Sequence, residues 1–148
     1  VVKMVVSAKD RGKSAEGLLK DYLEKRSRQQ SFAHMRLPDA HAGSLVATLA
    51  DFMVLQDGKF QLIECKSTRQ EHRLPHANFD TGQVARMRIW QLAGANCFVM
   101  IYHEMLGLWR SYSLDYFVTR TGGSWNLRDT EPTTLEKAFE NYAFNSPK

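Results

Sequence analysis

Apolar side chains recur along this chain at two spacings, and the change from one spacing to the other predicts its helices and strands. Apolar residues three and four positions apart indicate helical turns, and Ser14 is suited to cap the first helix. On this basis the predicted helices span residues 14–26, 79 or 80 to about 93, 114–119 and 133–142.

Uninterrupted or alternating apolar stretches predict the strands, which cover residues 45–55, 60–66, 97–102 and 108–113. The stretch over 97–102 is apolar throughout, which is typical of a strand buried on both faces. The intervals 29–44 and 67–78 are expected to be loops, the first with room for a short strand. This order of elements predicts an α/β layered fold, in which helices flank a mixed central β-sheet.

Length and composition narrow the class of protein. The 148 residues, 43% of them hydrophobic and 24% charged, suit a single domain over residues 1–148. The apolar run at 97–102 is too short to span a membrane, and no secretory signal pattern is seen. The two cysteines, Cys65 and Cys97, lack the spacing of a metal site. We therefore expect a soluble, cytoplasmic protein without a membrane partner and, because no glycine-rich phosphate loop is present, without a nucleotide cofactor.

Basic residues gather in two segments of the chain. The 20 Lys and Arg against 16 Asp and Glu give a formal net charge of +4. Residues 1–30 hold eight basic and four acidic side chains, and residues 59–90 hold six basic and three acidic ones. The formal net charge of all other residues is −3. Lys and Arg make most protein contacts with phosphates, so this distribution permits a polyanionic partner. A solvated basic surface is the alternative that charge alone leaves open.

The most informative element is the predicted hairpin around residues 57–58, an Asp-Gly pair that tolerates the positive φ angles of a tight turn. Pairing outward from this turn places Asp51 opposite Glu64. Because side chains alternate along a strand, Glu64 and Lys66 then share a face with Asp51. One largely apolar face of the hairpin thus ends in two carboxylates and a lysine.

Two opposed carboxylates have Cβ atoms about 5 Å apart and repel each other, and their burial is costly. A divalent cation removes the conflict, since Mg²⁺ is typically held by one or two carboxylates. Lys66 can then hold the attacking water or stabilise charge on a phosphate. The pattern predicts Mg²⁺-assisted phosphodiester hydrolysis, and we expect Mn²⁺ to substitute. Taken singly, Asp51 could merely open a strand and Glu64 with Lys66 could be a structural ion pair.

Asp51, followed after the hairpin by Ile63-Glu64-Cys65-Lys66, resembles the signature of the PD-(D/E)XK nucleases. The order of features from about Lys13 to Phe144 is similar to that of the RecU-type Holliday junction resolvases of bacteria and their phages. These features are an early helix with Glu16, the hairpin, a basic loop, a helix with Gln83 and a buried strand.

The resemblance implies a restriction-endonuclease-like fold and assigns roles to single residues. The implied metal ligands are Asp51, Glu64, the backbone carbonyl of Cys65 and, through water, Glu16. Lys66 would be the catalytic lysine, and Gln83 would be the polar residue of the later helix that faces the site. A carboxylate that stabilises a helix N-terminus and an exposed helix-start glutamine are the alternatives for Glu16 and Gln83. The resemblance further implies a homodimer that nicks opposing strands of a four-way junction.

The candidate phosphate contacts are Arg11, Lys13, Arg69, Arg73 and Arg86. His72 and His76 are four residues apart, but Pro75 disfavours the helix that would align them, so we expect no zinc site. The interval 27–50 looks shorter than the projecting stalk of RecU-type proteins. We therefore predict a Holliday junction resolvase. The alternatives are a structure-tolerant endonuclease acting on linear, nicked or flapped DNA and, in another class, a non-catalytic DNA-binding module.

Overall fold

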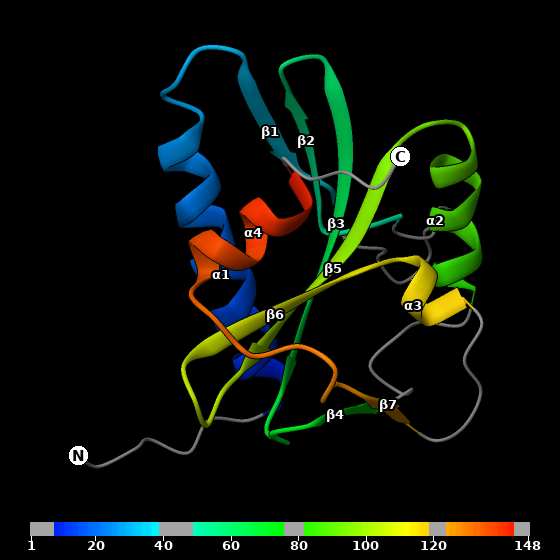
Figure 1. Ribbon diagram of the computed structural model, residues 1–148. Helices are drawn as coiled ribbons and strands as arrows, with labels where there is room; N and C mark the ends of the chain where they lie inside the picture. Colours follow the sequence, from blue (N-terminus) through cyan, green and yellow to red (C-terminus); the bar gives the residue numbers. More distant parts are fainter. Residues whose placement is uncertain (1–7, 39–48, 76–81, 119–123, 144–148) are drawn as a thin grey trace.

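The computed structural model describes residues 8–38, 49–75, 82–118 and 124–143 (Figure 1). Its helices are α1 (Ala8–Arg26), α2 (Gln83–Leu92), α3 (Asp115–Val118) and α4 (Leu135–Ala143). Its strands are β1 (Phe32–Arg36), β2 (Phe52–Gln56), β3 (Lys59–Thr68), β4 (Arg73–Pro75), β5 (Asn96–His103), β6 (Leu108–Ser113) and β7 (Ser124–Asn126). Among the described residues, no helix is both long and apolar enough to cross a membrane.

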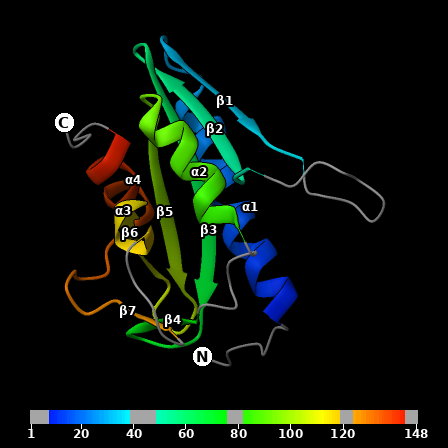
Figure 2. The ribbon, with the colours of Figure 1, turned by 90° about the vertical axis from the view of Figure 1, so that its right-hand side faces the viewer.

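Five strands form the central sheet in the order β1-β2-β3-β5-β6. The pair β3 and β5 is parallel and the other neighbouring pairs are antiparallel, so the sheet is mixed as predicted. Helices α1 and α4 cover one face, and α2 lies on the other (Figures 1 and 2). Strands β4 and β7 form a separate two-stranded sheet at one end. The predicted layered α/β fold is confirmed.

Alternation along β3 divides the core between the two faces of the sheet. Ile63 and Cys65 pack with residues of α1 and α4, including Leu19 and Phe139. Leu62 packs on the opposite face with residues of α2 and β5. A third cluster, built around Val99 and Ile101 of β5, packs with residues of β4, α3 and β7. Strand β5 is buried over both faces, which its apolar sequence predicted.

Several predicted boundaries were wrong. Helix α1 begins at Ala8, so Ser14 lies inside the helix and does not cap it. Strand β2 begins at Phe52 and not at residue 45, and residues 45–48 lie outside the described part. Helix α2 begins at Gln83, and the predicted start at residues 79–80 also lies outside the described part.

The two intervals predicted as loops both contain strands. The first holds β1, an edge strand whose five residues, Phe32–Arg36, pair with β2. The second holds β4, and β3 itself runs on to Thr68, two residues beyond its predicted end. Strand β7, which pairs with β4, was not predicted at all. Short strands of this kind carry too few residues for a period to show, and their partners are distant in the sequence.

Candidate active site

The β2–β3 hairpin has the register that the sequence predicted. Asp57 and Gly58 have φ angles of 50° and 78°, as a tight hairpin turn requires. Gln56 pairs with Lys59, and the ladder continues outward to Phe52 opposite Ile63. The turn chemistry therefore fixes which side chains of the two strands share a face.

Asp51 lies immediately before β2, at the far end of this ladder. Its N–H donates to the carbonyl of Ile63 at 3.1 Å, which continues the pairing by one residue. Its Oδ2 accepts a hydrogen bond of 2.8 Å from the N–H of Cys65. The Asp51 side chain, only 7% exposed, is thus fixed against the middle of β3 beside Glu64.

Glu64 and Lys66 follow on β3 and form a close ion pair. Lys66 Nζ lies 2.7 Å from Oε2 of Glu64, and Glu64 is 3% exposed. The second carboxylate oxygen of Glu64, Oε1, is buried and has no hydrogen-bond partner in the described structure. One acceptor of this pair is therefore satisfied, whereas the other has lost its water without gaining a partner.

The raised pKa of Asp51 shows that its carboxyl group is buried close to other negative charges. Burial, followed by repulsion from Glu64 and Glu16, raises the pKa of Asp51 from 3.8 to about 9. The hydrogen bond from Cys65 opposes this rise and does not cancel it. A bound cation would remove both causes, because it neutralises the charges and replaces the lost hydration.

Glu16, on α1, belongs to the same acidic cluster. Its charge raises the pKa of both Asp51 and Cys65, in keeping with a position near the start of β2. Its carboxylate pairs with Arg36, the last residue of β1. Arg36 is opposite Phe52 in the sheet, one residue from Asp51. The sequence analysis missed Arg36, since it allowed a short strand within residues 29–44 and gave neither the bounds nor the partner of that strand.

Gln83 and Arg86 lie on α2, which covers the face toward which the alternation of β3 directs Glu64 and Lys66. Gln83 is the first residue of the helix and is only 3% exposed, so the alternative of an exposed glutamine is wrong. Its Oε1 has no hydrogen-bond partner in the described structure. A Cβ added to Gly82 would lie 3.2 Å from a terminal nitrogen of Arg86, so this guanidinium folds back beside the helix start.

The remaining basic candidates are placed differently. Arg69 and Arg73 are exposed on the segment between β3 and β4, where Thr68 Oγ1 donates to the carbonyl of Arg73 at 2.9 Å. Arg11 and Lys13 belong to α1, but their side chains lie outside the described part of the chain. His76 also lies outside the described residues.

Two carboxylates supplemented by a carbonyl oxygen and water are ordinary Mg²⁺ ligands. In the described ranges, no group of three or more His, Cys, Asp and Glu side chains could hold a metal ion, so any ion here would depend on such backbone and water ligands. The unpartnered Oε1 of Glu64 and the raised pKa of Asp51 are the features that a divalent cation would relieve. Asp51, Glu64 and the carbonyl of Cys65 therefore fit a magnesium site.

Both cysteines are free thiols, and both are buried in the central sheet, Cys65 in β3 and Cys97 in β5. Burial raises the pKa of the Cys65 thiol well above its usual range, and the nearby carboxylates raise it further. Burial raises the pKa of Cys97 to about 12. Cys65 packs on the α1 face of the sheet and Cys97 on the α2 face.

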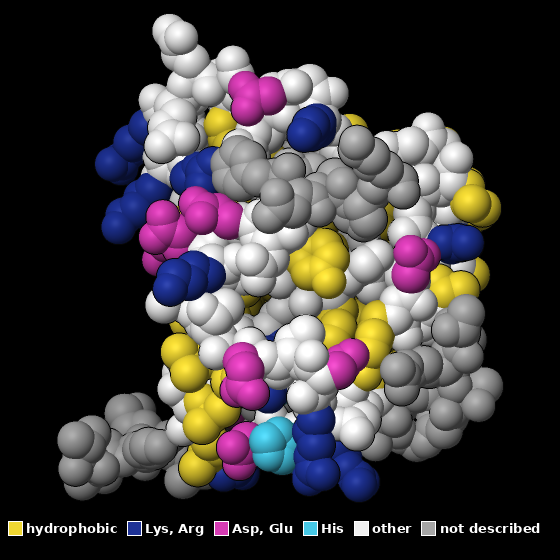
Figure 3. Space-filling model, in the orientation of Figure 1, with side chains coloured by type: hydrophobic (Ala, Val, Ile, Leu, Met, Phe, Trp, Pro, Cys, Tyr) yellow, Lys and Arg dark blue, Asp and Glu magenta, His cyan; other side chains and the backbone are white. Residues whose placement is uncertain are grey.

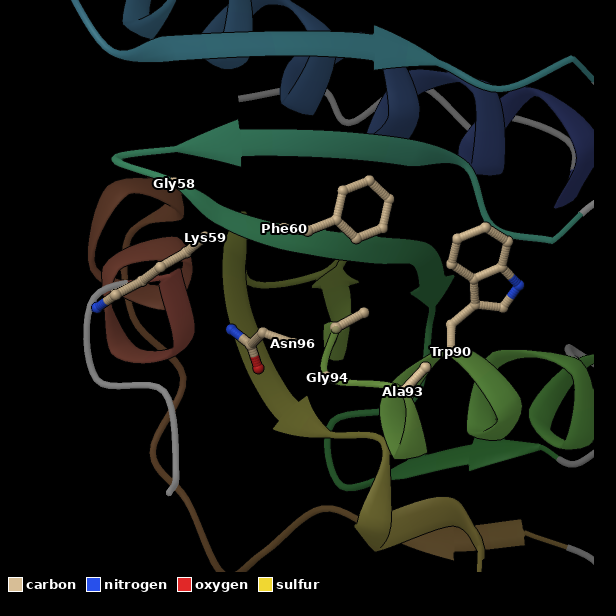
Figure 4. Close-up of a pocket in the computed structure, with 8 residues that line it drawn as sticks. Gly58, Lys59, Phe60, Trp90, Ala93, Gly94 and Asn96 are labelled. Atoms are coloured by element: carbon tan, nitrogen blue, oxygen red, sulfur yellow. The ribbon is translucent and has the colours of Figure 1, made fainter.

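A cavity of about 570 Å³ lies at the hairpin-turn end of β3, away from the carboxylates. Phe60 and Trp90 stack beside it with ring centroids 5.9 Å apart (Figure 4). Its lining holds Lys59 and no acidic side chain, so it offers no cation site. At about 3.3 Å per strand residue, Phe60 is roughly 13 Å from Glu64, and the cavity is separate from the acidic cluster.

Comparison with known proteins shows which solved structures share this fold. No protein-family model and no curated protein sequence matches the chain. Among solved structures, it is similar to the Holliday junction resolvase Hjc of the archaeal hyperthermophile Archaeoglobus fulgidus. The TM-score is 0.57 at 20% identity, over 78% of this chain and 86% of Hjc. It is also similar to the bacterial homing endonuclease I-Ssp6803I, with a TM-score of 0.51 at 15% identity, over 86% of this chain and 79% of the endonuclease. The restriction-endonuclease-like fold that the sequence predicted is thus confirmed.

Proposed function

We propose that this protein is a Mg²⁺-dependent DNA endonuclease, and specifically a Holliday junction resolvase. The observation that carries the proposal is the buried arrangement of Asp51, Glu64 and Lys66 at one end of the hairpin. A fold stabilised only by its core has no need to bury two repelling carboxylates, which costs free energy. The same three residues carry the resemblance to the PD-(D/E)XK signature, and both structural neighbours are named as DNA-cleaving enzymes.

The chain's own residues have separable roles in this reaction. Asp51, Glu64 and the carbonyl of Cys65 would hold the metal, which supplies Lewis-acid activation of water and of the phosphate. Hydrogen bonding from Cys65 N–H keeps Asp51 oriented, and the ion pair with Glu64 keeps the ammonium of Lys66 at the site. That ammonium can hold the attacking water or stabilise the negative charge that develops on the phosphate. Arg69 and Arg73 would contact neighbouring phosphates.

Paired nicks in a four-way junction require two active sites, so the proposal includes a homodimer. One surface of the chain suits such an interface. Leu55 on β2, Trp90 and Leu92 on α2 and Met35 on β1 are all between 46% and 72% exposed. Trp90 lines the cavity beside Phe60 (Figure 4), and Leu55 is the partner of Phe60 across the hairpin. Clustered exposed apolar residues next to a hollow are typical of protein interfaces.

A cleavage assay tests the function. A mobile four-way junction, a flap and a linear duplex are each incubated with the protein and Mg²⁺, beside the matched variant Glu64→Gln. We expect symmetric paired nicks in the junction alone, absent from the variant and from reactions that contain a chelator. Cleavage of all three substrates would keep the endonuclease and reject junction specificity. Failure to cut any of them would reject the catalytic role of the hairpin and favour a non-catalytic DNA-binding module.

A second candidate is an endonuclease that acts on linear, nicked or flapped DNA. The likeness to a homing endonuclease supports it, because the same fold there belongs to an enzyme that is not named for junctions. The short interval before Asp51 supports it as well, since it leaves less chain for a junction-entering projection. The flap and duplex reactions of the same assay separate the two candidates.

A further inference from the structure

The turn between β5 and β6 has an unusual composition for a hairpin. It runs through Glu104, Met105, Leu106 and Gly107, and the N–H groups of Leu106 and Gly107 both donate to the carbonyl of His103, at 3.1 and 2.9 Å. Turn positions are commonly Gly, Asn, Asp or Ser, which serve the backbone. Here only Gly107, with a φ of 65°, follows that rule. Met105 and Leu106 are 50% and 40% exposed and are not needed by the backbone geometry.

This turn is fastened to the segment that follows the proposed catalytic lysine. The N–H of Glu104 donates to the carbonyl of Thr68 at 3.0 Å. Nδ1 of His103 lies 3.2 Å from the carbonyl of Gln70, and Arg110 donates to the carbonyl of Glu71 at 2.7 Å. His103 and Arg110 are almost fully buried and bond to each other at 3.0 Å. The turn and residues 68–71 are therefore held together as one hydrogen-bonded unit.

Basic residues flank this unit, and its strands are in register with the acidic cluster. Residues 66–73 contain three basic residues, Lys66, Arg69 and Arg73, against the acid Glu71, and the turn itself adds one acid, Glu104. Lys66 pairs with Ile101 of β5, and β5 ends two residues later at His103. At about 3.3 Å per strand residue the turn begins roughly 7 Å beyond Lys66 and its tip lies roughly 10 Å beyond it, which is about three base pairs along a duplex. Figure 3 shows the apolar side chains over the β5–β6 turn and the basic side chains near β4 at the same end of the molecule.

We propose that Met105 and Leu106 form an apolar wedge that contacts DNA bases and unstacks a base step about three base pairs from the cut. Apolar side chains that insert between base steps kink the duplex, and flanking basic residues hold the backbone while they do so. Arg69 and Arg73 are the flanking basic residues here. Because the turn is bonded to the segment after β3, contact at the wedge also fixes where the backbone crosses Lys66. This proposal rests on the proposed DNA endonuclease.

The test uses DNA that carries 2-aminopurine at single positions two to six nucleotides from the mapped cut, on both sides. The fluorescence of this base rises when it unstacks. Binding is measured on the full chain with Glu64→Gln, so that DNA is bound without being cut. We expect fluorescence to rise at or next to position three, and Met105→Ser with Leu106→Ser to abolish the rise and weaken binding about tenfold, since two half-exposed apolar side chains lose their contact. Met105→Leu should retain the rise.

A matched control is Val118→Ala, which removes an exposed apolar side chain, 38% exposed, from α3. It should leave both fluorescence and affinity unchanged. Equal fluorescence and affinity in the double Ser variant and the parent would overturn the wedge while leaving the endonuclease intact. Loss of affinity in the Val118→Ala control to the same degree would also overturn it. If the Glu64→Gln parent binds no DNA at all, both the proposed function and the wedge are rejected. The cleavage assay of the wild-type chain tests the proposed function independently of the wedge.

Discussion

Replacing Asp51 with Asn should make the metal-free protein more stable while it abolishes cleavage. Asn keeps the shape of the side chain and can still accept the hydrogen bond from Cys65 N–H. It removes the negative charge that burial and two neighbouring carboxylates oppose. The variant therefore separates two effects that other substitutions mix, namely the free energy that the site costs the fold and the function that the site serves.

The magnitude follows from the pKa of Asp51, which is raised from 3.8 to about 9 in the fold. A raised carboxyl pKa means that the folded chain binds this proton more tightly than the unfolded chain does. Stability from this group is therefore complete below pH 3.8 and is lost as the pH rises from 3.8 to about 9. At 1.36 kcal/mol per pKa unit, the loss at pH 7 is at most about 4 kcal/mol. Because buried charges in proteins interact as in an effective dielectric constant of about 20, well above that of a dry interior, we expect a gain of about 2 kcal/mol in the variant.

The assay is urea unfolding of both proteins in a chelator at pH 4, 5.5, 7 and 8.5. The free energies of unfolding should be nearly equal at pH 4 and should separate progressively as the pH rises, with Asp51→Asn the more stable. Added Mg²⁺ should stabilise only the wild type, since a ligand bound to the folded state alone shifts the equilibrium toward it. A variant that is equally stable or less stable at pH 8.5 in the chelator would refute this account of the site.

Three further predictions concern other parts of the chain. Lys66→Ala should abolish cleavage and leave DNA affinity within about twofold in a filter-binding assay, because one of several phosphate contacts carries little of the total. Arg69→Ala and Arg73→Ala should each weaken binding to junction and duplex alike and lower the slope of log affinity against log salt by about one, a result that unchanged salt dependence would contradict. Burial lowers the pKa of His103 from 6.5 to about 4, so the fold should lose up to about 3 kcal/mol as the pH falls from 6.5 to 4. His103→Gln should lack that loss in the same urea experiment.

The hairpin was predictable because its information is local. An Asp-Gly turn sets the register, and the register then determines which residues of the next ten share a face. The position of Asp51 beside Glu64 follows from that alone. The buried β5 was equally clear, since a short apolar run bounded by polar residues is typical of a strand covered on both faces.

The rest depended on contacts between distant segments. Residues 8–13 include Gly12 and have no apolar period, yet they are helical as part of α1. Strand β1 owes its existence to pairing with β2, and Arg36 enters the site only through that pairing. Gln83 was assigned by resemblance, and nothing in its own surroundings in the sequence indicated that it would be buried. Tertiary pairing decides such positions, and a single sequence carries little trace of it.

The reactivity of the two buried thiols can report local unfolding on each side of the central sheet. Cys65 lies in β3 between Glu64 and Lys66 and Cys97 lies in β5, and each thiol is held unreactive by burial and a raised pKa. A thiol reagent can label either one only when its surroundings open. The ratio of the two labelling rates therefore compares fluctuations on the α1 side of the sheet, where Cys65 directly follows Glu64 in β3, with fluctuations beneath α2. Mg²⁺ that binds at Asp51 and Glu64 should slow the labelling of Cys65 more than that of Cys97, which would locate the ion without any measurement of catalysis.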